Sequence, residues 1–189
     1  MTVALPKPVL TADRFARKLD TDGLELIDGR LVRKTMGAIA SWIQSQLNAR
    51  LVNHVNAHRL GYVFESECAY ACFPGRPNHV RKPDVSFVKF GRLAGELIPD
   101  TLIPIAPDFV VEVLSTHETV GQLYGKIGDF ESVGVPLIWI VSPETRTVQV
   151  RRSGSIAEFR GEAELSADPA IPGFRVRTED LFPPKPIPA

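Results

Sequence analysis

The order of apolar and polar positions along the chain predicts a hairpin followed by a long helix. Residues 24–32 place apolar side chains on both sides of Asp28-Gly29, a dipeptide typical of the two-residue turn that joins paired strands. Apolar residues then recur with the spacing of one helix face from about Gly37 to His58. We therefore expect an N-terminal hairpin and, directly after it, a helix of several turns.

The second half of the chain carries the pattern of a parallel strand pair. Phe109–Leu114 is an apolar run interrupted only by Glu112, and Leu137–Val141 is a second apolar run. Such continuous runs are typical of strands that are buried on both faces of a sheet. A helical pattern from Glu118 to about Val133 lies between them. The segment therefore predicts a strand–helix–strand unit, which builds parallel pairing.

Shorter strands are predicted before and after this unit. They are expected at Tyr62–Ser66, Ala69–Phe73, Val85–Val88, Thr147–Arg151, Ile156–Arg160 and Phe174–Val176. Between them, the stretch from Gly91 to Pro107 is rich in proline and glycine, so we expect it to be irregular and to lie on the surface.

Length and composition point to one domain over residues 11–180, with an N-terminal arm at 1–10 and a proline-rich tail at 181–189. The 22 basic and 22 acidic residues give a net charge of zero, which counts against a broadly basic nucleic-acid-binding surface but leaves a local patch open. Neither a signal-peptide pattern nor an apolar run of membrane-spanning length is present. We therefore expect a cytoplasmic protein without a membrane partner.

Two carboxylates occupy positions where an acid is unfavourable unless it has a partner. Asp84 follows Pro83 at the start of a strand, and Glu112 lies within a valine-rich run. Alternation along that strand places Glu112 on the face of Val110 and Leu114. A carboxylate in such surroundings must be paired, protonated or bound to a metal. The simpler interpretations are a turn or cap role for Asp84 and a buried salt bridge for Glu112.

Lys126 and Glu25 are further candidates. On a helical wheel Lys126 falls between Phe130 and Val133, inside the apolar face of its helix. Its amine must either extend to solvent or reach an acid near the strand ends. Glu25 lies in the first strand of the predicted hairpin, where an exposed position is the alternative to a functional one. Arg81 and Lys82, beside Asp84, are either surface charges or contacts to backbone phosphate.

An aspartate, a glutamate and a lysine that converge are chemically sufficient for metal-assisted hydrolysis of a phosphodiester. Carboxylates held together bind Mg²⁺, which prefers oxygen ligands and keeps several waters. The bound ion polarises the phosphodiester and lowers the pKa of a bound water. The lysine can orient that water or stabilise the charge that develops on the phosphate.

The order of several segments carries a resemblance to a known family. They are Leu24-Glu-Leu-Ile-Asp-Gly-Arg-Leu-Val32, Arg81-Lys-Pro-Asp-Val-Ser-Phe-Val88, Pro107-Asp-Phe-Val-Val-Glu-Val-Leu-Ser115, Lys126 and Gly134-Val-Pro-Leu-Ile-Trp-Ile-Val141. Together they resemble the Uma family of restriction endonucleases, which belongs to the PD-(D/E)xK nuclease superfamily. The resemblance covers roughly residues 11 to 180.

The resemblance implies an α/β fold with a restriction-endonuclease-like mixed central sheet flanked by helices. It implies Asp84 and Glu112 as ligands of Mg²⁺ or Mn²⁺, Lys126 as the catalytic lysine and Glu25 as a supporting catalytic acid. The expected function is metal-dependent endonucleolytic hydrolysis of phosphodiester bonds in DNA. Because cutting both strands of a duplex needs two sites, a homodimer is a plausible assembly.

Two positions depart from the family's pattern. In the wider superfamily the lysine stands two residues after the second acid, where this chain has Leu114. Similar family members often carry a histidine early in the long helix, and residues 35–41 contain none. The alternative function is therefore a catalytically inactive nuclease fold that serves as a binding or interaction module, with the acids retained as a structural network.

Overall fold

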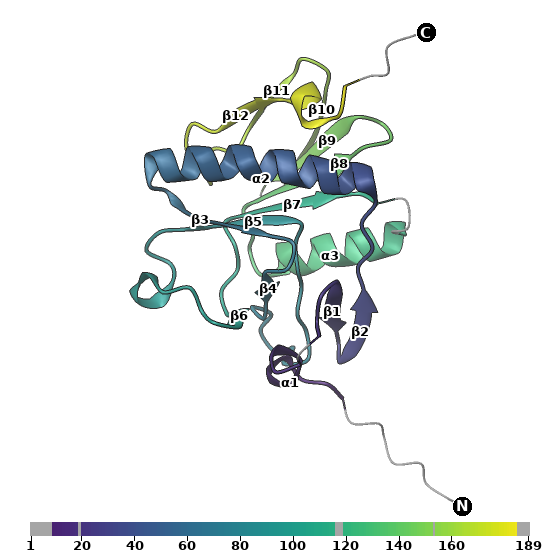
Figure 1. Cartoon of the computed structure of the whole chain (residues 1–189), viewed down its shortest axis with the longest axis vertical. Coiled ribbons are helices and arrows are strands. Elements are labelled where there is room, and N and C mark those ends of the chain that lie inside the picture. Colours follow the sequence, from purple (N-terminus) through teal and green to yellow (C-terminus); the bar gives the residue numbers. More distant parts are fainter. Residues whose placement is uncertain (1–8, 19, 116–118, 153, 185–189) are drawn as a thin grey trace, which may run out of the picture.

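The computed structural model describes residues 9–18, 20–115, 119–152 and 154–184. Most of the predicted arm at 1–10 and part of the predicted tail at 181–189 therefore lie outside the described residues. Figure 1 shows a central sheet with a helix on each side and a small hairpin beneath it. Among the described residues, no helix combines the length and apolar character needed to cross a bilayer.

A six-stranded mixed sheet forms the centre of the molecule. From one edge to the other, its strands are β10 (Ser155–Arg160), β9 (Thr147–Arg152), β8 (Leu137–Ser142), β7 (Phe109–Val113), β5 (Val85–Lys89) and β3 (Gly61–Glu65). The central β7–β8 pair is parallel, and the other neighbours are antiparallel. The predicted strand–helix–strand unit and the mixed sheet are thus confirmed.

The two main helices cover opposite faces of the sheet, α2 (Ala38–His58) on one and α3 (Val120–Ser132) on the other (Figure 1). Val111 and Val113 of β7 pack into the apolar cluster under α2, and Val110 packs into the cluster under α3. The alternation predicted for this strand is therefore correct. It places Glu112 on the face that α3 covers.

Local sequence explains both ends of α3. Thr119 is its N-cap, and a capping box joins Thr119 to Gln122: the Thr119 hydroxyl accepts the Gln122 N–H and the Gln122 side chain accepts the Thr119 N–H. Just past the helix, Gly134 has φ +77, a conformation that glycine adopts without strain. The predicted start at Glu118 lies outside the described residues.

The predicted hairpin is present beneath the sheet. Strand β1 (Leu24–Ile27) pairs antiparallel with β2 (Arg30–Arg33). Asp28 and Gly29, in the turn, both have positive φ, as a type I′ turn requires. The short helix α1 (Ala12–Ala16) packs Phe15 against Leu26 and Val80.

Smaller elements complete the chain. They are β4 (Ala69–Tyr70), β6 (Leu102–Ile103), β11 (Glu164–Ser166), β12 (Arg175–Arg177) and the 3₁₀ turns η1 (Ala94–Glu96) and η2 (Thr178–Leu181). The strand predicted at residues 69–73 is thus only two residues long. The stretch predicted to be irregular contains η1 and β6.

Candidate active site

Asp84 is held from both sides of the sheet. It directly precedes β5, and its side chain is 3 % exposed. Its Oδ2 accepts the backbone N–H of Val113 at 2.6 Å, and its backbone carbonyl accepts Nε2 of Gln44, on α2, at 2.8 Å. Its Oδ1 lies 2.5 Å from Nζ of Lys34. A carboxylate anchored in this way is neither an exposed turn residue nor a helix cap.

Glu112 is the most deeply buried acid of the site. Its Oε2 accepts a hydrogen bond from Nζ of Lys126 at 2.8 Å. Its Oε1 is buried and has no hydrogen-bond partner among the described residues. The pKa of Glu112 is raised to about 8, chiefly by burial and also by the charge of Asp84, while the charges of Lys126 and Lys34 act to lower it. The carboxyl group is therefore easily protonated near neutral pH.

Lys126 extends from the apolar face of α3 toward the sheet. Its neighbours Ile127 and Phe130 belong to the apolar cluster under α3, and the lysine itself is 4 % exposed. Its amine contacts Glu112. The prediction that Lys126 reaches an acid is therefore correct, and the alternative, an amine that extends to solvent, is wrong. The position of Lys126 inside the apolar face, visible in the sequence, is thus explained by its partner on β7.

Glu25 is buried rather than exposed. Its Oε1 accepts the backbone N–H of Lys82 at 2.8 Å, and its Oε2 accepts a hydrogen bond from Arg81 at 3.1 Å. The hairpin therefore holds the two residues that lead into Pro83 and Asp84. In this arrangement Glu25 positions the segment before Asp84, and its part in catalysis stays a prediction.

Lys34 belongs to the site and was not predicted. It follows β2 directly, and its backbone N–H donates to the carbonyl of Gly23 at 2.7 Å. Its amine contacts Asp84 and donates to the carbonyl of Lys82 at 3.0 Å. No local pattern marks it, because Arg33-Lys34 reads as a pair of solvated charges at the end of a hairpin.

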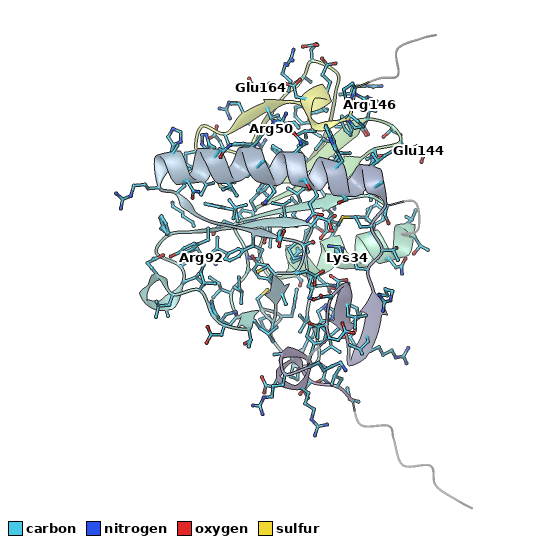
Figure 2. The ribbon with its side chains drawn as sticks, in the orientation of Figure 1. Lys34, Arg50, Arg92, Glu144, Arg146 and Glu164 are labelled. Atoms are coloured by element: carbon cyan, nitrogen blue, oxygen red, sulfur yellow. The ribbon has the colours of Figure 1, made fainter. Side chains whose placement is uncertain are left out.

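A cavity of about 500 Å³ brings these side chains together. Its polar wall contains Glu25, Lys34, Arg81, Asp84 and Lys126, contributed by the hairpin, the start of β5 and α3. Figure 2 labels Lys34 between the hairpin and α3. Glu112 does not line the cavity and contacts it through Lys126, which does. The cavity is therefore bounded by groups of both charges.

A second buried network braces this wall. Asp129 of α3 accepts a hydrogen bond from Arg81 Nε at 2.7 Å, lies 2.8 Å from Nε2 of His79, and also pairs with Arg76. Arg76 pairs in turn with Asp28 in the hairpin turn. Although burial acts against it, hydrogen bonds from His79 and Arg76 hold the pKa of Asp129 below its usual value. The network ties the hairpin to α3.

The interpretation of Arg81 and Lys82 as surface charges is wrong, and their contact with a backbone phosphate stays a prediction. Both side chains are buried. Arg81 is shared between Glu25 and Asp129, while Lys82 Nζ contacts Glu67 at 2.6 Å and the carbonyl of Thr21 at 2.8 Å. Both are buried cations whose charged groups contact acids and backbone carbonyls of the protein itself.

The donor set at Asp84 and Glu112 fits a hard divalent cation. No cluster of three or more histidine, cysteine or acidic side chains able to hold a metal occurs among the described residues. Mg²⁺, however, is commonly held by one or two carboxylates and keeps its remaining waters. The buried Oε1 of Glu112, which has no partner among the described residues, is an acceptor of the kind that such an ion satisfies.

The fold, a mixed central sheet with a helix on each face and an N-terminal hairpin, is restriction-endonuclease-like. The chain belongs to the Uma2 family, described as "Putative restriction endonuclease", whose model matches residues 13–179. The chain is also similar to the crystal structure of "a putative nuclease belonging to DUF820" from Anabaena variabilis ATCC 29413. That similarity has a TM-score of 0.77 at 24 % identity and covers 92 % of this chain and 97 % of the other. Among curated proteins there is no significant match.

Proposed function

We propose that this protein is a metal-dependent endonuclease that hydrolyses phosphodiester bonds of DNA. The observation that carries the proposal is the convergence of Asp84, just before β5, with Glu112 of β7 and Lys126 of α3 beside one cavity. Residues so far apart in the chain meet only because the strands are adjacent and α3 covers one face. Membership of the Uma2 family supports a nuclease, and the metal and the DNA substrate are part of our proposal.

Asp84 and Glu112 would hold Mg²⁺ or Mn²⁺, and the bound ion would supply polarisation of the phosphodiester and acidification of a water. The amine of Lys126 fixes one oxygen of Glu112 and lines the cavity, where it can also donate to a phosphate oxygen. The backbone N–H of Val113 fixes one oxygen of Asp84. Both acids are thus oriented before any ligand binds, which reduces the ordering that substrate binding must bring about.

The proposal is tested by incubating supercoiled plasmid with the purified protein and Mg²⁺ or Mn²⁺. We expect cleavage by the wild type, and a loss on the order of a hundredfold or more in Asp84→Asn, Glu112→Gln and Lys126→Met. Glu131→Gln is a matched control, because Glu131 also lies on α3 but forms a surface pair with Arg151 and is 45 % exposed. Wild-type protein that cuts neither DNA nor RNA with either ion contradicts the proposal.

An inactive binding module is favoured by one specific observation: each acid already contacts a lysine, Asp84 with Lys34 and Glu112 with Lys126. In that case the four side chains form a neutral structural network. Calorimetric titration with Mn²⁺ separates the two functions, because a nuclease site binds the ion and a closed network does not. A binding module also leaves partner binding unchanged in Glu112→Gln.

Cleavage of both strands of a duplex requires two active sites. We therefore extend the proposal to a homodimer, tested by light scattering in the presence and absence of a DNA duplex. A particle of one chain mass in both conditions, together with nicking of only one strand, contradicts this extension while leaving the active site itself in place.

A further inference from the structure

The two oxygens of Asp84 have partners of different kinds. Oδ2 accepts the N–H of Val113 at 2.6 Å, a contact between neighbouring strands that cannot be released without separating them. Oδ1 forms an ion pair with Nζ of Lys34 at 2.5 Å but has no hydrogen-bond partner among the described residues, and the amine is the end of a flexible side chain. A cation that binds Oδ1 comes close to the Lys34 amine, and the repulsion between the two positive charges favours displacement of the amine.

The backbone of Lys34 is fixed, but its side chain can rotate and so move its amine. Its backbone is anchored by the hydrogen bond to Gly23, but its side chain has four rotatable carbon–carbon bonds and lines the 500 Å³ cavity. The only other contact of its amine with the described residues is the carbonyl of Lys82 at 3.0 Å. Rotation of the side chain carries the charge from Asp84 into the cavity while the hairpin stays in place.

Lys126 contacts only one of the two oxygens of its acid, Glu112, and leaves the other available. Its amine contacts Oε2 of Glu112, while Oε1 of Glu112 has no hydrogen-bond partner among the described residues. Glu112 can therefore accept an ion at Oε1 while its contact with Lys126 persists. Of the two lysines, Lys34 is the one whose contact competes directly with a metal.

We infer that Lys34 is an internal cation that holds Asp84 in the metal-free protein, is displaced when a divalent ion binds, and then pairs in the cavity with a phosphate of the substrate. This inference rests on the proposed function, because it needs Asp84 to be a metal ligand. Charge balance supports it. Once an ion has bound and both acids are ionised, their charges cancel those of the two lysines, so the ion leaves two positive charges in a buried site unless a lysine moves away, which is unfavourable.

The test compares Mn²⁺ affinity by calorimetry in the wild type, Lys34→Met and Lys89→Met. Lys89 is the matched control, because it is exposed and lies at the opposite end of β5 from Asp84. We expect Lys34→Met to bind Mn²⁺ about tenfold tighter or more, because the ion no longer has to break a buried ion pair to reach Asp84. We expect Lys89→Met to match the wild type. Because Asp84 then lacks its cation, Mn²⁺ should also raise the Tm of Lys34→Met more than that of the wild type.

DNA cleavage should change in the opposite direction to Mn²⁺ affinity. Lys34→Met should bind the ion more tightly than the wild type but should bind and cut DNA less well. Equal or weaker Mn²⁺ binding by Lys34→Met overturns the inference and leaves the proposed function standing. Absence of Mn²⁺ binding in both proteins overturns the metal site itself. If Lys34→Met does not fold, Lys34→Gln makes the same comparison, because its amide keeps a hydrogen-bond donor and removes the charge.

Discussion

Nζ of Lys126 lies 2.8 Å from Oε2 of Glu112, and this buried pair joins α3 to the central strand β7. Both side chains are almost completely excluded from solvent, at 5 % and 2 % exposure. Because the pair leaves the second oxygen of Glu112 without a partner among the described residues, it orients the acid without saturating it. One oxygen of Glu112 thus makes a structural contact, and the other is the oxygen that we propose as a metal ligand.

Removal of Lys126 should destabilise the protein most at alkaline pH. In Lys126→Met the carboxylate of Glu112 loses its cation, and breaking one side of a buried pair costs roughly 3–5 kcal/mol. The cost should shrink at pH 6, because protonated Glu112 no longer needs a cation. Urea denaturation at pH 6 and pH 9 in EDTA measures the difference. Equal destabilisation at the two pH values contradicts this account of the pair.

Glu112 should make the metal-free protein less stable as pH rises. Its pKa is raised from 4.5 to about 8 by burial, so the folded state holds a proton that the unfolded state releases between these values. The stability from this proton is fully present below pH 4.5 and is lost as pH rises to about 8. Relative to the wild type, Glu112→Gln should therefore gain up to about 1.4 kcal/mol of unfolding free energy per pH unit within that window. A difference that does not change with pH contradicts this prediction.

Binding of a divalent ion should release a proton near neutral pH. An ion bound to Glu112 requires the carboxylate form, whereas burial keeps the pKa of this group at about 8 in the metal-free protein. Mn²⁺ affinity should therefore rise between pH 6 and pH 8. Calorimetry at pH 7 in two buffers with different ionisation enthalpies measures the proton, and identical apparent enthalpies contradict its release.

Asp129→Asn should destabilise the fold by about 3 kcal/mol, because the buried cations around it lose their shared carboxylate. Arg81 would keep only Glu25, and the hairpin would be less firmly tied to α3. Glu131→Gln, two residues along the same helix, removes only a surface ion pair and should cost less than about 1 kcal/mol. Chemical denaturation of the two variants makes the comparison, and equal losses would show that the network adds nothing to stability.

The sequence predicts the elements best where periodicity is strong. The apolar runs around Glu112 and the helical pattern around Lys126 identify the strand, the helix and their buried faces together. A charged residue within an apolar pattern can be recognised from the sequence alone. The hairpin is equally clear, since Asp28-Gly29 favours one turn type. Strand β11 is missed because three residues are too few to establish a period.

The remaining part of the site depends on contacts that only the folded chain creates. Lys34 reads as a surface charge, and it becomes a partner of Asp84 because the end of the hairpin lies beside the start of β5. Arg81 reads as an exposed residue, and it is buried because Glu25 and Asp129 meet there from two other elements. Pairings across such sequence distances leave no local pattern.

The central claim is that Asp84 and Glu112 share a divalent cation. It is tested most directly by an anomalous difference map from crystals grown with Mn²⁺. The account predicts a peak within coordination distance of carboxylate oxygens of both acids, with the amine of Lys34 moved off Asp84 and into the cavity. Well-diffracting crystals with no peak at this place, and with Lys34 still bound to Asp84, would contradict it.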